Sequence, residues 1–233
     1  MSNIQKWAYG KAVCTFSPTG YNYDRTIEAV NTRLYELSKV SKLLSEEEYE
    51  DLYTALCVCN LAPRKADGKS NIDSHGDAAQ ESAEMFLKSI PEILSMEIGL
   101  NRVKRIATLI RCTDNRKPLS SYKDIPQKLL YIINDIQNLF YADMDKLMDI
   151  EKKHINLICF GDTDESVGAG VPIPVELEAK KTMRDFYEFV AEQIRKNKLL
   201  YRFFFFAKYN LIAYLNIEQR IIDLTEEIEK GKA

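Results

Sequence analysis

The spacing of hydrophobic positions predicts helices along most of the chain. Apolar side chains recur every three or four residues from residue 24 onward, first at Ile27, Val30, Leu34, Leu37 and Val40. This spacing places them on one face of a helix. Similar patterns predict helices over about 45–60, from about 77, from Pro91, and over 100–112, 125–150, 176–196 and 199–230. We therefore expect an all-α protein with a single helical domain of about seven or eight helices.

The second of these helices carries the clearest local signals. Ser45 and Glu48 have the spacing of a capping box, in which each side chain bonds the other residue's backbone amide. Its second half, ALCVCNLA, is apolar on all sides. This pattern predicts a central buried helix.

Three segments lack a helical period. Residues 1–23 contain Pro18 and Gly20 and are interpreted as an irregular N-terminal arm, which leaves 24–233 for the helical domain. Residues 64–77 are polar and predict a loop. Residues 161–175 form an acidic loop rich in glycine and proline, a candidate lid. The only strand-like segment is INLICF, at 155–160.

Composition places the chain among ordinary soluble proteins. Of its 233 residues, 45% are hydrophobic and 29% are charged, and the net charge is −3. This balance argues against a general nucleic-acid binder, which carries a basic surplus. A local cluster at Arg102, Arg105 and Arg111 is interpreted either as a solvated helix face or as an anion or nucleic-acid patch.

Cysteine usage and hydropathy predict a cytoplasmic protein without a membrane span. The five cysteines are odd in number and scattered, and no secretory signal is visible, which favours a reducing compartment. The most hydrophobic stretch, residues 199–215, contains Arg202 and Lys208 and is shorter than a spanning helix of about 20 residues. We expect it to be a buried core helix.

Common catalytic motifs are missing from the sequence. It contains no P-loop, no dinucleotide-binding glycine motif, no nucleophile elbow, no H-E-x-x-H and no C-x-x-C. Its two histidines are His75 and His154, too few for a histidine-rich metal site. His154 is interpreted as a solvated residue at a helix end. His75 is interpreted either as a turn residue with local hydrogen bonds or as a ligand at a helix N-terminus, where free amides favour anions.

Four segments, in order, resemble the HD superfamily of metal-dependent phosphohydrolases, which are all-α proteins of about this size. The segments are YNYDRTIEAVNTRLYEL, LYTALCVCNLAPRKADG, HGDAAQESAEMFL and LLYIINDIQNLFYAD. They resemble, in turn, the family's helix with the first metal-binding histidine, the helix ending in the His-Asp pair, the "HG..SA..L" segment and the helix with the last metal-binding aspartate. The tail DFYEFVAEQI…FFFFAKYNLIAYL is similar to the closing helix pair of bacterial members. The resemblance implies an HD-like helical fold.

At the positions matched by this resemblance, most metal ligands are missing. The first histidine falls within residues 24–26, which read Asp-Arg-Thr, and the His-Asp pair reads Cys59-Asn60. Asp135 matches the last aspartate and His75 an auxiliary histidine. HD chemistry needs imidazoles and carboxylates that hold divalent cations, which activate a water. Asparagine keeps the shape of aspartate but not its charge.

The resemblance therefore implies a degenerate pocket and no confident catalytic residue. Its candidate residues are Asn60, His75, Asp77 and Asp135. Any metal would rest on Asp135 and His75 alone, which would hold it weakly.

Three functions follow from these patterns. The first is an HD-like protein that has lost hydrolysis, needs no cofactor and acts by binding a protein, a nucleotide or a nucleic acid. For this function we expect the partner to be a protein or a second copy of the chain. The second is a phosphohydrolase with a non-standard divalent-metal site at Asp24, His75, Asp77 and Asp135. The third is an unrelated helical scaffold or assembly protein. The first two require Asn60, His75 and Asp135 to converge in space.

Overall fold

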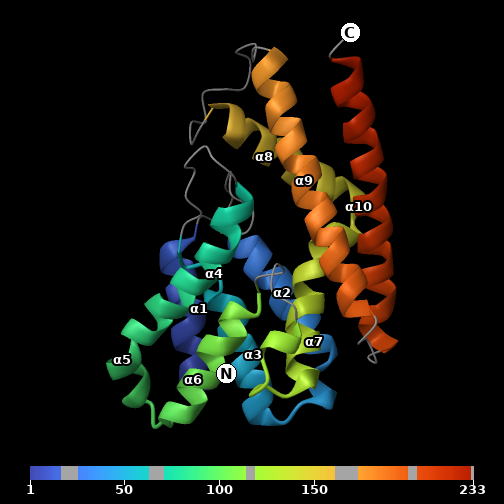
Figure 1. Cartoon of the computed structure of the whole chain (residues 1–233). Helices are drawn as coiled ribbons and strands as arrows, with labels where there is room; N and C mark the ends of the chain where they lie inside the picture. The colour runs from blue at the N-terminus through green and yellow to red at the C-terminus, as the bar shows by residue number, and fades with distance from the viewer. Residues whose placement is uncertain (17–25, 63–70, 114–118, 161–172, 199–203, 232–233) are drawn as a thin grey trace. The chain divides into compact units, whose positions relative to one another are not determined.

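The computed structural model describes residues 1–16, 26–62, 71–113, 119–160, 173–198 and 204–231, in which the regular elements are helices (Figure 1). In chain order the α-helices are α1 (Asn3–Thr15), α2 (Ile27–Lys39), α3 (Glu46–Val58), α4 (Asn71–Lys88), α5 (Ile90–Leu94), α6 (Leu100–Arg111), α7 (Gln127–Asn138), α8 (Met144–Phe160), α9 (Ile173–Lys198) and α10 (Phe204–Lys230). Short 3-10 turns lie at η2 (Ser41–Leu43), η3 (Leu119–Ser121) and η4 (Leu139–Ala142). The all-α prediction is confirmed. The count within the described residues is ten α-helices, above the seven or eight expected.

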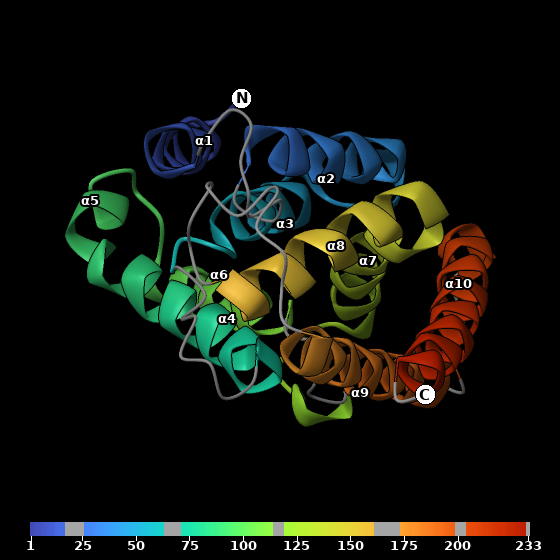
Figure 2. The same cartoon turned by 90° about the horizontal axis from the view of Figure 1, so that it is seen from above.

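The chain divides into two compact units. Unit 1 comprises Met1–Arg64 and His75–Gln137, and unit 2 comprises Lys65–Ser74 and Asn138–Ala233. In unit 1, α3 contacts α1, α2 and α6 (Figure 2). Its residues from Asp51 to Val58 are all buried, which confirms the expected central helix. The capping box is also confirmed, because Glu48 N donates to Ser45 Oγ at 3.2 Å and Ser45 N donates to Glu48 Oε2 at 2.8 Å.

The expected irregular arm at residues 1–23 is wrong over residues 3–15, which form α1. The buried side of α1 consists of Ile4, Gln5, Ala8 and Ala12. Alanines allow α1 to approach α3 closely, but they give only a weak hydrophobic period. At the start of the helix, Ser2 N donates to Gln5 Oε1 at 2.8 Å. Residues 17–25, which include Pro18, Gly20 and Asp24, lie outside the described residues.

The single long helix expected over residues 125–150 is also wrong, because it is interrupted between α7 and α8. Phe140 and Tyr141 are buried in η4, and Asp143 has an extended backbone with φ −109° and ψ 111°. The Asp143 side chain then caps α8 by accepting a hydrogen bond from Lys146 N at 3.2 Å. The strand-like segment 155–160 is the last part of α8.

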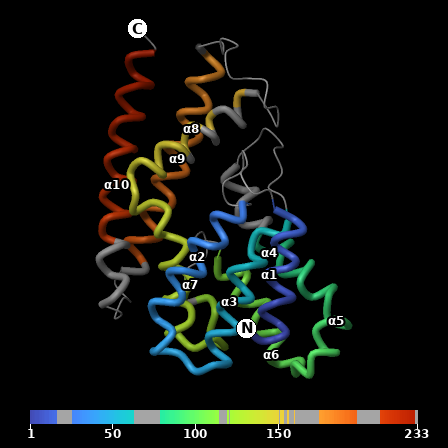
Figure 3. The backbone as a smooth tube through the Cα atoms, turned by 180° about the vertical axis from the view of Figure 1, so that it is seen from behind, coloured from blue at the N-terminus to red at the C-terminus, as the bar shows by residue number. Residues whose placement is uncertain are grey.

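Unit 2 is built on α8, α9 and α10. The last two helices run antiparallel and side by side, and α8 contacts α9 (Figures 1 and 3). Their shared core includes Tyr141, Leu147, Met183, Tyr187, Val190, Ala213, Ile217 and Leu224. The expected closing pair of helices is therefore present, although α9 begins at Ile173 and α10 at Phe204. Residues 161–172 of the expected acidic loop lie outside the described residues, whereas 173–175 are helical.

None of the helices that the structure describes combines the length and the apolar character of a membrane span.

Candidate functional site

The Cys59-Asn60 pair lies where α3 ends in unit 1. Cys59 is fully buried, and its Sγ donates to the Leu56 carbonyl at 3.5 Å. Gln137 Nε2 donates to the same sulfur at 3.7 Å, which holds α7 beside this end of α3. Asn60, the next residue, is half-buried. The thiol at this position therefore takes part in packing between two helices.

A second bond ties the same segment to α4. The backbone amide of Ala62 donates to the buried hydroxyl of Ser82 at 3.0 Å. The chain therefore leaves α3 between α7, on which Gln137 lies, and α4. His75 and Asp77 belong to the first half of α4, but their side chains lie outside the described residues.

Asp135 is buried within unit 1. It lies on α7, two residues before Gln137, and only 1% of its surface is exposed. Asn134 beside it is 2% exposed. A buried carboxylate costs considerable free energy unless the protein surrounds it with polar groups. The interior near α7 is thus polar, as a ligand pocket or a structural polar core requires.

The sequence analysis missed Arg33 on α2. Among the side chains of unit 1 that the structure describes, this arginine is the largest that is fully buried, with 1% of its surface exposed. Burial raises the pKa of the Cys57 thiol, and the nearby Arg33 charge opposes that rise. A signal was present in the sequence, because Arg33 falls between Val30 and Leu37 on the apolar face of its helix. A charged residue within such a face indicates a buried polar contact.

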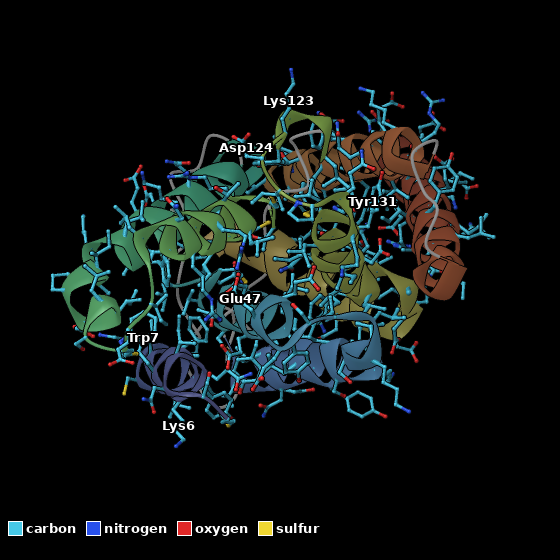
Figure 4. All side chains as sticks on the ribbon, turned by 90° about the horizontal axis from the view of Figure 1, so that it is seen from below. Lys6, Trp7, Glu47, Lys123, Asp124 and Tyr131 are labelled. Carbon is cyan, nitrogen blue, oxygen red and sulfur yellow. The ribbon has the colours of Figure 1, made fainter. Side chains whose placement is uncertain are left out.

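Two members of the candidate anion patch, Arg102 and Arg105, bind carboxylates of α3. Arg102 Nε donates to Asp51 Oδ1 and Arg105 Nε to Asp51 Oδ2, each at 2.6 Å. Arg102 Nη2 also reaches Glu50 Oε2 at 2.6 Å, and Arg105 Nη2 binds Glu47. Glu47, labelled in Figure 4, lies on the side of α3 that faces α6. Together these five side chains form what we call the α3–α6 ion cluster.

The electrostatics of this cluster favour a structural role. Burial raises the pKa of the fully buried Asp51, whereas Arg102 and then Arg105 act to lower it. Burial acts to lower the pKa of both arginines, but their hydrogen bonds to carboxylates raise it overall. An external anion would compete with carboxylates already held at 2.6 Å. The anion patch stays a prediction, and Arg111, half-buried at the end of α6, is the member outside the cluster.

A metal centre stays a prediction as well. Among the residues whose side chains are described, no group of three or more His, Cys, Asp or Glu gathers to hold a cation. His75 and Asp77 fall outside that set. The Cys59-Asn60 pair itself offers a cation only a buried thiol and a neutral amide.

Comparison with known proteins adds no relative. No family model, no curated protein and no solved structure matches the chain.

Proposed function

We propose that the chain is a helical binding protein that resembles the HD superfamily and acts without hydrolysis. The observation that carries the proposal is the position of Cys59. This residue stands where the resemblance expects the metal-binding histidine, and its buried sulfur bonds to Leu56 and Gln137. In this arrangement the residue contributes to helix packing and supplies no imidazole ligand for a cation.

The chemistry of the neighbouring residue supports the same conclusion. Asn60 stands where the family has an aspartate, and an amide carries no charge to balance a divalent cation. Hydrolysis of a phosphate ester by a metal-activated water requires that cation to be firmly held and correctly oriented. Asp135 alone would hold it poorly.

The buried polar groups of unit 1 support binding. Arg33, Asn134 and Asp135 are each at most 2% exposed. Burying such groups costs free energy unless they are paired, and in some proteins buried polar groups provide specificity. The proposal covers a nucleotide, a nucleic acid or a protein as the bound partner, and a binding screen chooses among them.

The first experiment compares the native protein with a variant in which the family's pair is restored, Cys59→His/Asn60→Asp. Bound manganese, iron, nickel and zinc are measured by mass spectrometry, and hydrolysis of bis(p-nitrophenyl) phosphate is measured with added Mn²⁺. We expect metal and turnover to be absent from the native protein. If the resemblance is correct, the restored variant gains metal. Far-UV circular dichroism establishes that each protein is folded.

Asp135→Ala and Asp185→Ala are the matched variants. Asp185 is an exposed carboxylate on α9, so its removal controls for the loss of one negative charge. Near-stoichiometric metal in the native protein that only Asp135→Ala removes, together with turnover, would establish the hydrolase instead. Gain of metal by the folded restored variant would favour the HD-like scaffold over the unrelated helical one.

The binding part is tested by thermal melting with nucleotides and oligonucleotides. Trp7, the only tryptophan, gives a fluorescence signal from unit 1. Its Nε1 donates to Glu92 Oε2 at 2.8 Å, on the side of α1 that faces α5 (Figure 4). We expect a ligand of the correct class to raise the melting temperature of the native protein and to have no effect on Asp135→Asn.

A further inference from the structure

The outward side of α10 carries a row of exposed aliphatic side chains. Leu211, Leu215 and Ile222 are 46%, 56% and 52% exposed. Steps of four and seven residues place them on one side of a helix. We call these three residues the α10 stripe. Each other helix of the described chain exposes at most one large hydrophobic side chain, so the α10 stripe is a distinct feature.

The opposite side of α10 is already buried in unit 2. It carries Ala213, Ile217, Leu224 and Ile228, all buried. Asn216 Nδ2 donates to the Tyr141 carbonyl at 3.0 Å, which fixes the rotation of α10 about its axis. The α10 stripe therefore cannot turn inward without breaking the core.

The charges along α10 are unevenly distributed. Residues 204–217 contain one lysine and no acidic residue. Residues 218–230 contain five acidic and two basic residues, and one of the basic ones, Arg220, is bound to Glu151 inside the unit. Two such helices packed in parallel would place their acidic halves together. Packed antiparallel, each acidic half faces the half that carries a positive charge.

We propose that two copies of this chain pair through α10 in an antiparallel arrangement, with Leu215 of one copy opposite Ile222 of the other. A two-fold axis near residues 218 and 219 makes this contact twice from one surface, as an isologous interface requires. The same arrangement covers the α10 stripe and pairs unlike charges. The inference concerns unit 2 and does not depend on the function proposed for unit 1.

The area that two α10 helices can bury sets the expected strength of dimerisation. One helix pair buries less than the roughly 1,600 Å² of a standard interface. We therefore expect an equilibrium between monomer and dimer that depends on protein concentration. Light scattering after size exclusion, over a range of loading concentrations, should show the mass rising from 26.9 kDa toward twice that value.

The test measures dimerisation of Leu215→Glu and Ile222→Glu, with Leu100→Glu as the control variant. Leu100 is 48% exposed at the start of α6 in unit 1, so it controls for the loss of an exposed leucine and the gain of a charge. We expect the α10 variants to weaken dimerisation at least tenfold and Leu100→Glu to leave it unchanged. A native protein that stays monomeric at several hundred micromolar overturns the proposal. A dimer that survives both α10 substitutions, each variant being folded, also overturns it.

Cross-linking tests the orientation. In a Cys14→Ser background, which removes the exposed native thiol, a mixture of Leu215→Cys and Ile222→Cys proteins is oxidised. We expect cross-linked dimer in the mixture and several-fold less with Leu215→Cys alone. The reverse result would indicate parallel pairing and would overturn the antiparallel arrangement.

Discussion

Arg220 and Glu151 form a two-bonded ion pair inside unit 2. Arg220 Nε donates to Glu151 Oε2 at 2.9 Å and Arg220 Nη2 donates to Glu151 Oε1 at 2.6 Å. Their side chains are 8% and 7% exposed. Burial raises the pKa of the neighbouring Tyr187, and the Glu151 charge raises it further. The pair joins α8 to α10 within a polar layer of the core.

Arg220→Met should destabilise unit 2 strongly. The substitution leaves the Glu151 carboxylate buried without its cation, and removing one partner of a buried pair typically costs about 3–5 kcal/mol. The double variant Glu151→Met/Arg220→Met should recover most of that loss, because no buried charge remains. Urea unfolding followed by far-UV circular dichroism gives the free energies.

Lys230→Met is the control for the comparison of Arg220→Met with the double variant. Lys230 and Glu226 form a well-exposed pair at 3.3 Å, so its loss should change the unfolding free energy by less than about 0.5 kcal/mol. Equal effects of Arg220→Met and Lys230→Met would contradict the expectation that the buried Glu151 carboxylate requires its cation.

Glu48 should contribute to the acid sensitivity of the protein. A hydrogen bond from Lys128 Nζ at 2.7 Å lowers the pKa of Glu48, and the Ser45 amide lowers it further, against the opposing effect of burial. Because the folded pKa lies below the unfolded value of about 4.3, the contribution is present above that pH and is lost as pH falls through the folded pKa. Asp51, whose pKa is raised by burial, has the opposite sign.

We therefore expect Glu48→Gln to flatten the loss of stability between about pH 6 and pH 3, by less than about 1 kcal/mol at this partly exposed site. Glutamine keeps an oxygen for the Ser45 amide, so the capping box persists while the charge is removed. Lys128→Met should flatten the same part of the profile. Urea midpoints measured across this pH range provide the test, and unchanged pH profiles in both variants would contradict it.

The sequence predicted the elements whose signals are local. The capping box of Ser45 and Glu48 and the buried second half of α3 depend on neighbouring residues only, and both are present. The helix α1 was missed because its buried contacts are made by Ala8 and Ala12, which contribute little to a hydrophobic period. The break at Asp143 was missed because the pattern on both sides of it is helical, and tertiary burial of Phe140 and Tyr141 accompanies the break.

Most of the candidate site depends on contacts between distant segments. The bonds of Asp51 join residues about fifty positions apart in sequence, so the arginines of α6 were visible as a basic cluster but their partners were not. The Cys59-Asn60 pair was recognised through a resemblance, and its contact with Gln137 required the fold. Whether Asn60, His75 and Asp135 converge stays a prediction.

Glu97→Gly should stabilise the protein. Glu97 has a φ of 63°, in the left-handed region where a side chain is strained, and it follows the end of α5. Glycine adopts this conformation without the steric cost, so we expect a gain of about 0.5–1 kcal/mol. Glu97→Ala keeps a Cβ atom and should give no such gain. Thermal melting of the three proteins distinguishes relief of backbone strain from loss of the charge.

The five cysteines should differ widely in reactivity. Cys14 is exposed, Cys159 is half-buried, and Cys57, Cys59 and Cys112 are buried. A thiol reacts as the thiolate, and burial raises the pKa of both Cys57 and Cys159. In the native protein we expect one fast reaction with Ellman's reagent, from Cys14, and a slower one from Cys159 that accelerates as pH rises. The three buried thiols should react only after urea unfolding.

Cys14→Ser should remove the fast phase and leave the others, because the burial of Cys57 and Cys59 is set by the packing of α3 and not by the exposed end of α1. Fast reaction of more than one thiol in folded Cys14→Ser protein would show that the end of α3 opens to solvent, and the assignment of Cys59 to helix packing would then fail.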